Sequence, residues 1–387
     1  MSNRLLIGQN SPNSNNSRYH VPSFRLQGII ILQHFRFSFI FTFICLGLAA
    51  WWGFSHGPEA GINNMFKVLL ITAILAVMEV SLSFDNAVVN ASVLRHWDEF
   101  WKKIFLTVGI LIAVFGMRLI FPLLIVGVTA DMSMVEVARL ALDDPKAYSE
   151  KLMAHHAEIA AFGGLFLLLV FLNFFFDDEK DTHWFHWLEH RLANLANVPA
   201  MSVFIALVAL LVMVSAVEGE TKLVVTLAGI WGVVVYVGVK ALGHLLESSS
   251  GDDEEEEEKT SSGASSKIVK AGIGGFLYLE VLDASFSFDG VIGAFAITSD
   301  VVVIMLGLAI GAMFVRSMTI YLVEKGTLEA YIYLEHGAHY AIGALAFIML
   351  FSGTGVHVPE VVTGLIGVAF IVWAVISSIS HSKKEAA

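Results

Sequence analysis

Apolar stretches of about 20 residues recur along almost the whole chain, and this pattern limits what the chain can fold into. A helix needs roughly 20 apolar residues to cross a hydrocarbon core of about 30 Å. The chain is 56% hydrophobic and only 15% charged, whereas a soluble domain carries about 25% charged residues. The sequence therefore predicts an all-α, polytopic membrane helix bundle, with the lipid bilayer as its first partner.

We expect ten spans, each bounded to within a few residues. They cover residues 36–54, 65–94, 103–127, 156–176, 199–217, 222–246, 267–298, 299–324, 331–353 and 360–381. An even number of crossings places both termini on one side of the membrane. With the termini inside, cytoplasmic segments hold sixteen of the 23 basic residues and external loops hold four. The positive-inside rule therefore predicts a multi-pass protein of the bacterial inner (cytoplasmic) membrane with both termini cytoplasmic.

Two polar segments flank and divide the predicted membrane halves. Residues 1–35 are rich in Asn and Ser and are predicted to form a disordered cytoplasmic tail, before an N-terminal membrane half at 36–246. An acidic cytoplasmic linker at 247–266 carries the Asp and Glu run 252–258, a composition that cannot bury a core. The C-terminal membrane half covers 267–387.

The second and seventh predicted spans carry the same acidic motif, 204 positions apart. The positions related by this shift are Ser81 and Ser285, Ser83 and Ser287, Phe84 and Phe288, Asp85 and Asp289, and Glu79 and Asp283. A span with a central arginine follows each copy, Arg118 in one and Arg316 in the other. Five crossings separate the copies, an odd number, so the copies enter the membrane from opposite sides. The sequence predicts an inverted three-helix repeat, a recurring transporter architecture, with repeat 1 at 65–176 and repeat 2 at 267–353.

Ionisable side chains inside a membrane are costly unless they are paired or face a polar cavity, so the acids of the motif are functional candidates. On an unbroken helix, Glu79 and Asp85 would point about 120° apart. Both can face one ligand only if the helix unwinds near Ser83, where freed carbonyls would add oxygen ligands. The second copy is expected to unwind in the same way, because Gly290 makes unwinding easier.

Sites rich in carboxylate oxygens suit Mg²⁺, Ca²⁺ or Mn²⁺, and an imidazole ligand shifts the preference toward Mn²⁺. The expected metal ligands are Glu79, Ser83, Asp85, Asn86, Asp283, Ser287 and Asp289, with His156 and His336 as further candidates. Each histidine lies near a helix end, so a structural or interfacial role is its alternative. No resident cofactor is expected, since the divalent cation would be the substrate.

The two arginines allow a competing interpretation of the acidic motif. Arg118 and Arg316 could each neutralise one acid and form buried ion pairs that only fix the packing of the helices. Four carboxylates against two arginines leave a charge of about −2, which a buried site resists by protonation or by binding a cation. We therefore expect both arginines to tune the charge of a cation site.

Three motifs resemble the TerC superfamily of integral membrane proteins, in particular its DUF475 branch. They are the copy from Glu79 to Asn86, the copy from Asp283 to Asp289, and the segment from Leu334 to His339, and the likeness covers most of residues 65–381. The wider family is linked to tellurite resistance and to manganese export. The resemblance implies a cation site at Glu79, Asp85, Asn86, Asp283 and Asp289. The additional spans between the repeats and the acidic linker depart from the usual family pattern.

The leading functional hypothesis is a secondary transporter that exports Mn²⁺ or a similar divalent cation. The chain has no Walker-type Gly-x-x-x-x-Gly-Lys-Ser/Thr sequence, so ATP hydrolysis is not expected. Two intramembrane acids could serve an aspartyl protease, but the matched arginines and the Ser and Asn lining argue against an enzyme. The alternative is a non-transporting membrane partner of a metal or tellurite stress-response or secretion complex. No nucleic-acid partner is expected, and a homo-oligomer or an assembly with other membrane proteins stays open.

Overall fold

The computed structural model describes a bundle of helices, and its described residues contain no strand. The described residues are 24–56, 60–109, 111–176, 182–185, 187, 189, 198, 200–217, 219, 221–249, 272–356 and 358–385. The first half contains α1 (Phe24–Ser55), α2 (Ile62–Leu82), α3 (Phe84–Leu94), α4 (Glu99–Ile104), η1 (Phe105–Gly109), η2 (Ile112–Ile120), α5 (Phe121–Thr129), α6 (Met134–Asp143), α7 (Pro145–Met153) and α8 (His156–Phe175). The second half contains α10 (Met201–Ala216), α11 (Thr221–Ser249), α12 (Ile273–Ile297), α13 (Val301–Glu324), α14 (Thr327–Ala330), α15 (Leu334–Ser352) and α16 (Glu360–Glu385).

Eight helical segments of the described chain are long and apolar enough to cross a membrane, which confirms the polytopic helix bundle. They are His34–Ser55, Ile62–Leu82, Glu99–Val128, His156–Phe175, Thr221–Leu242, Val301–Glu324, Leu334–Ser352 and Val362–Lys384. The other two predicted spans coincide with α10, which is apolar but has 16 residues, and with α12, which carries Glu280, Asp283 and Asp289. Each of the ten predicted spans therefore has a helical counterpart.

Two predicted polar segments lie partly outside the described residues. Helix α1 begins at Phe24 and so extends into the last part of the predicted tail. The apolar run at residues 29–32, Ile-Ile-Ile-Leu, favours an extension of the first helix over a disordered tail. Residues 1–23 and most of the predicted linker, 250–266, lie outside the described part of the chain.

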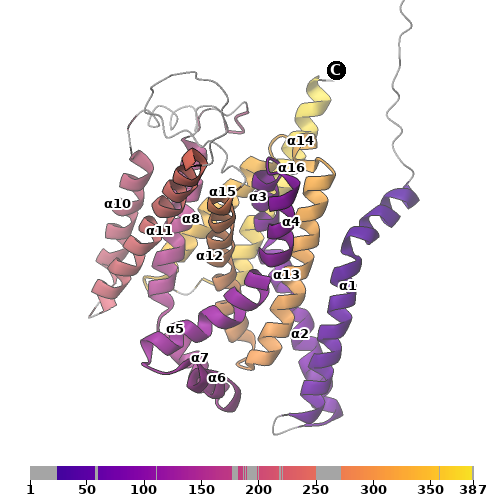
Figure 1. The fold of residues 1–387 in the computed structure, drawn as a ribbon, viewed down its shortest axis with the longest axis vertical. Helices are drawn as coiled ribbons and strands as arrows, with labels where there is room; N and C mark the ends of the chain where they lie inside the picture. Colours follow the sequence, from indigo (N-terminus) through magenta and orange to yellow (C-terminus); the bar gives the residue numbers. More distant parts are fainter. Residues whose placement is uncertain are drawn as a thin grey trace, which may run out of the picture.

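The described chain begins and ends at the same end of the bundle (Figure 1). The carboxyl end of α16 lies there with α4 and α14, and the amino end of α1 lies at the same level, whereas α5, α6 and α7 lie at the opposite end. Two contacts fix the direction of α1 relative to α13: the rings of His34 and Trp52 hydrogen-bond Glu324 at 2.7 Å and Asp300 at 2.9 Å. These two helices are therefore antiparallel.

Small residues bring the central helices close together. A Cβ added to Gly307 of α13 would lie 2.5 Å from the Cβ of Leu75, and one added to Gly311 would lie 2.4 Å from the Cβ of Glu79. Glycines at helix contacts let backbones approach closely, which is how helices associate inside a bilayer. Helix α2 thus runs parallel to α13 and lies directly against it.

The two copies of the acidic motif run in opposite directions. Glu79 of α2 lies beside Gly290 of α12, and Asn90 of α3 lines the same cavity as Asp283. From Glu79 to Asn90 the residue numbers rise along the first copy, whereas the residues that lie beside them in α12 have falling numbers. The third helices of the repeats, α8 and α15, are also antiparallel, since Gly163 lies against Met349 and Phe171 lies against Gly343. These contacts agree with the inverted repeat.

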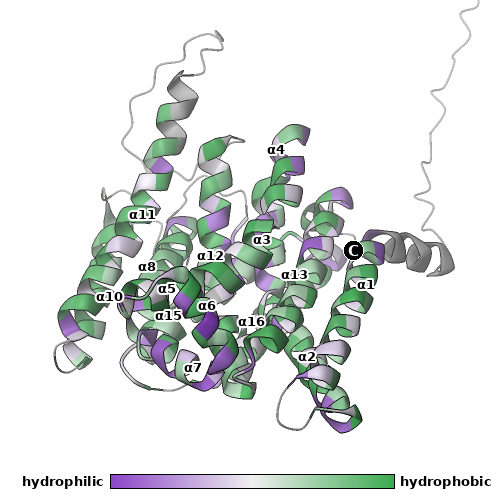
Figure 2. Ribbon diagram, turned by 60° about the horizontal axis from the view of Figure 1, so that its bottom comes forward, coloured by the Kyte–Doolittle hydropathy of each residue, from purple (hydrophilic) through white to green (hydrophobic). Residues whose placement is uncertain are grey.

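Most of the membrane helices are hydrophobic along much of their length (Figure 2). Large apolar residues more than half exposed include Phe43, Leu70, Leu211, Trp231 and Leu365. A soluble protein rarely exposes apolar surface on this scale, so these faces fit contact with lipid. The polar stretches of α6 and α7 stand out at the end of the bundle in the same view, and Ser133 caps α6 in a reciprocal box with Glu136.

Candidate functional site

The first copy of the motif is interrupted at one residue. Helix α2 ends at Leu82 and α3 begins at Phe84, and Ser83 between them has φ −102° and ψ 17°. The Ser83 N–H still donates to the carbonyl of Glu79 at 3.0 Å, so the chain turns without separating the two helices. The interruption lies at the predicted position and lets Glu79 and Asp85 line the same cavity.

This cavity, here called the motif cavity, lies among α2, α3, α12, α15 and α16. Its polar lining consists of Glu79, Ser83, Asp85 and Thr363, and its apolar lining consists of Leu82, Phe286, Gly290, Ala341, Leu345, Gly364 and Gly367. Asp85 is only 5% exposed and lies in the first turn of α3. There the N-terminal end of the helix dipole stabilises a negative charge.

Glu79 is held by two neighbours inside the bundle. Its Oε1 accepts a very short hydrogen bond from Nη2 of Arg118 and a second from the hydroxyl of Ser83 at 3.0 Å. Its Oε2 occupies the space beside Gly290, where a Cβ would lie only 2.7 Å away. The carboxylate is therefore fixed between the motif cavity and the arginine.

Arg118 lies on η2, a π-helical segment, and its side chain is buried. Nη1 donates to the carbonyl of Ala113 at 2.6 Å, and Nη2 donates to Glu79. Nε has no hydrogen-bond partner among the described residues. Segments of π-helix are rare and are frequent at functional sites, which agrees with an arginine placed here to hold an acid.

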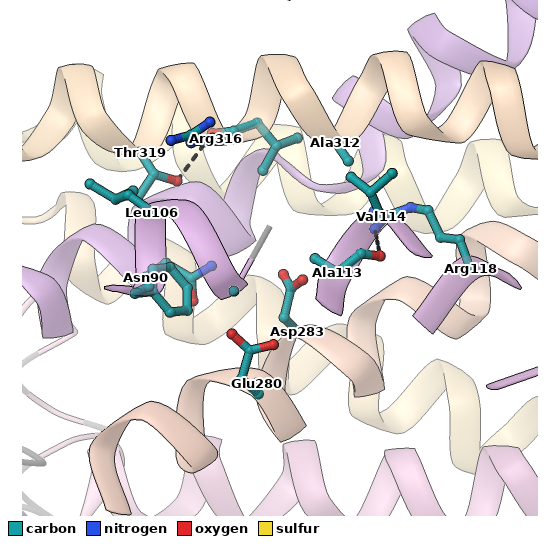
Figure 3. A pocket seen from close by; sticks show the side chains of 13 residues that line it. Asn90, Leu106, Ala113, Val114, Arg118, Glu280, Asp283, Ala312, Arg316 and Thr319 are labelled. Atoms are coloured by element: carbon teal, nitrogen blue, oxygen red, sulfur yellow. Dashed lines mark hydrogen bonds between the residues drawn. The ribbon is translucent and has the colours of Figure 1, made fainter. Parts of the chain in front are cut away.

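A second cavity, here called the acid-pair cavity, is lined in part by Arg118 (Figure 3). Its polar lining consists of Asn90, Arg118, Glu280, Asp283, Arg316 and Thr319. The Asp283 carboxylate shares this cavity with the amide of Asn90 and interacts electrostatically with Arg118 and Glu79. The carboxylates of Glu280 and Asp283 rise from α12 toward the middle of this cavity.

The second copy of the motif is not interrupted. Helix α12 is continuous from Ile273 to Ile297, so the prediction that it unwinds at Gly290 is wrong. Gly290 instead provides room for the Glu79 carboxylate, a packing role that needs no change in the helical backbone. Ser287 is buried and its hydroxyl has no partner in the described part of the chain, and the side chain of Asp289 lies outside that part.

The two candidate histidines lie at opposite ends of the bundle and line neither cavity. Each is in the first turn of its helix, and α8 and α15 are antiparallel. The Nε2 of His336 donates to the carbonyl of Thr182 at 2.9 Å and lies 3.7 Å from Glu189. Asn86 is buried outside both cavities, and its Oδ1 has no partner among the described residues. The backbone N–H of Asn86 donates to Oδ1 of Asp85 at 3.1 Å, so the structure separates only the two histidines from the acids.

The sequence profile of a family described as "Protein of unknown function (DUF475)" matches residues 84–385. The chain belongs to the DUF475 family. No curated protein and no solved structure matches it. The matched range begins after Glu79 and Ser83 but includes Asp85, Arg118 and the acids of α12.

The acids of this DUF475 protein are divided between two cavities, with Arg118 and Glu79 between them. Within the described ranges, no three His, Cys, Asp or Glu side chains converge closely enough to hold a metal ion. The motif cavity offers two carboxylates and two hydroxyls, and the acid-pair cavity offers two carboxylates and one amide. Either set provides oxygen ligands for a cation that keeps some of its waters.

One buried acid of the DUF475 chain does not appear in the sequence prediction. Glu280 is 6% exposed and lies one turn before Asp283 on α12. The comparison of the two motif copies hides it, because the position 204 residues earlier is Ala76. The rule that an ionisable residue within a span is a functional candidate would have found it. Thr319 and Thr363 escape notice because threonine carries no such signal.

Proposed function

We propose that this protein is a secondary transporter that exports Mn²⁺ or a similar divalent cation through the acid-lined cavities at the interface of its two repeats. One observation carries the proposal. Two cavities inside the bundle contain four buried or half-buried acids and two arginines. If all ionise, a charge of about −2 stays inside the membrane, which is costly unless protons or a cation neutralise it.

The motif cavity has the chemistry of a site for a hard cation. Asp85 and Glu79 supply carboxylate oxygens, and Ser83 and Thr363 supply hydroxyls. Such ligands suit Mg²⁺, Ca²⁺ and Mn²⁺. A cation entering this cavity competes with Arg118 for Glu79. Arg118 then acts as the counter-charge that holds Glu79 when the ion is absent.

The antiparallel arrangement of the motif copies supports transport over a fixed structural role. In transporters built from inverted repeats, the site lies at the repeat interface and the repeats move against each other around it. Membership of DUF475 names no substrate, so the choice of Mn²⁺ rests on the ligand chemistry and on the resemblance to the TerC superfamily, to which we assign the chain. We place it in the bacterial inner membrane with both termini cytoplasmic, on the distribution of its basic residues.

The test is cation flux in proteoliposomes that contain the purified full-length chain. Mn²⁺, Ca²⁺, Mg²⁺, Zn²⁺ and tellurite are each offered and their movement is followed across the membrane. We expect Mn²⁺ flux well above that of empty liposomes, and flux at the empty-liposome level for Asp85→Asn. Glu324→Gln is the matched control, because Glu324 lies exposed at a helix end. Inserted protein that moves none of these ions would overturn the proposal and favour the non-transporting partner.

A further inference from the structure

We propose that Glu280 and Asp283, together with the side-chain oxygen of Asn90, form a second cation-binding station that is separate from the motif cavity. This inference rests on the proposed transport of a divalent cation and adds a ligand, Glu280, that the repeat does not contain. The ligand class is a hard divalent cation that keeps several waters.

The geometry of α12 places the two carboxylates together. Glu280 and Asp283 are three positions apart, so they lie on the same face of the helix. Both line the acid-pair cavity, and their carboxylates come near one another in its centre (Figure 3). Two like charges at close range in a poorly solvated space favour the binding of a cation or of a proton.

Two oxygens in this cavity have no hydrogen-bond partner among the described residues. They are Oε1 of Glu280 and Oδ1 of Asn90, and the two residues are only 6% and 5% exposed. A buried acceptor without a partner costs free energy. Asn90 lines the cavity together with the two acids, and its Oδ1 is available to a ligand there.

Neither arginine of the cavity is committed to Glu280. Arg118 donates to Glu79 and to the carbonyl of Ala113. Arg316 forms no ion pair with any described residue, and its Nε has no partner there. The two arginines lie on opposite sides of the acid pair (Figure 3). They can therefore balance the charge of the site without occupying the place between the carboxylates.

Gly109 of η1 lies next to Glu280 and leaves room for its carboxylate. A Cβ added to Gly109 of η1 would lie 2.5 Å from Oε1 of Glu280. An alanine at this position would displace the carboxylate without changing its charge. Gly109→Ala therefore probes the position of the ligand, whereas Glu280→Gln probes its charge.

The experiment counts the Mn²⁺ ions bound by the purified full-length protein in detergent, by equilibrium dialysis followed by metal analysis. We expect two ions per wild-type chain, one for Glu280→Gln, one for Asp85→Asn and none for the double variant. The control Glu324→Gln should keep both ions. Gly109→Ala should lower the affinity for the second ion by about tenfold or more, as expected when a ligand is misplaced. The melting temperature of each variant in detergent establishes that it is folded.

The outcomes separate this inference from the proposed function. If Glu280→Gln binds two ions with wild-type affinity while Asp85→Asn loses one and stops transporting, the second station is wrong and the transporter stands. If Glu280→Gln changes proton release but not the number of ions, the acid pair is a proton site and the station is again wrong. If the wild type binds none of the divalent cations offered in the flux assay, both proposals fail.

Discussion

The two copies of the acidic motif have nearly the same sequence but different structures. In the first copy, Ser83 interrupts the helix and Glu79 is paired with Arg118. In the second copy, α12 is continuous, and Arg316 forms no ion pair with a described residue. Asp283, the counterpart of Glu79, instead shares a cavity with Asn90 and Glu280.

Equivalent residues of the two repeats therefore lie in different environments, although the motif sequences are similar. One repeat holds its acid in an ion pair, and the other leaves its acid facing a polar cavity. In transporters with inverted repeats, the two halves exchange conformations as access alternates between the two sides. Under the proposed transport function, we infer that the present structure corresponds to one of the two states of such a cycle.

The largest expected effect distinguishes the two arginines. Arg118→Gln or Glu79→Gln leaves one buried charge without its partner, and each should lower the free energy of unfolding by about 3–5 kcal/mol. Arg316→Gln breaks no ion pair among the described residues and should cost much less. The measurement is the melting temperature in detergent of the three single variants and of the Glu79→Gln/Arg118→Gln double variant.

The double variant serves as the internal control of that experiment. It removes both charges, so we expect it to be more stable than either single variant. An Arg316→Gln protein as unstable as Arg118→Gln would contradict the structural asymmetry of the two copies.

A smaller effect is expected where the two copies touch. Gly290→Ala would place a methyl group 2.7 Å from Oε2 of Glu79, and such overpacking should destabilise the fold by about 1–3 kcal/mol. Gly367→Ala is the matched control, since its nearest neighbour is Oδ2 of Asp85 at 3.8 Å. Thermal unfolding of the two variants compares them directly. Equal melting temperatures would show that Glu79 is not confined by α12.

The smallest expected effect on stability is a difference between alanine substitutions at Ser83 and at Ser287. Ser83 donates to Glu79 at 3.0 Å, so Ser83→Ala should cost about 1 kcal/mol, the usual net value of one hydrogen bond. Its counterpart Ser287 has no partner for its hydroxyl in the described chain, so Ser287→Ala should be neutral or slightly stabilising. Unfolding of both variants under the same detergent conditions tests this, and a larger loss for Ser287→Ala would contradict it.

Most of the fold follows from the sequence, because long apolar stretches in a membrane have few alternatives to helices. The interruption near Ser83 also follows, since two acids six positions apart cannot face one cavity from a regular helix. The same argument fails for α12. There Gly290 is required by the neighbouring Glu79 carboxylate, a tertiary contact that the local sequence does not reveal.

The candidate site is predictable only in part. The pairing of Arg118 with Glu79, and not with Asp85, depends on how η2 packs against α2 and has no signal in residue spacing. His336 lies in the polar start of α15, which corresponds to the polar start of α8 in the first repeat. Because α15 packs antiparallel to α8, His336 lies at the other end of the bundle from His156, beside Thr182 and Glu189. Spacing along the chain predicts which residues share a helix face, whereas packing decides which faces meet.

The central claim is that divalent cations cross the membrane through the acids of the two motif copies. The most direct measurement compares Mn²⁺ flux into proteoliposomes that contain equal amounts of inserted wild type, Asp85→Asn or Asp289→Asn protein. Each variant removes one carboxylate of the predicted cation site and keeps the size of the side chain. We expect both variants to fall to the flux of empty liposomes. Wild-type flux in either variant would contradict a site shared by the two copies.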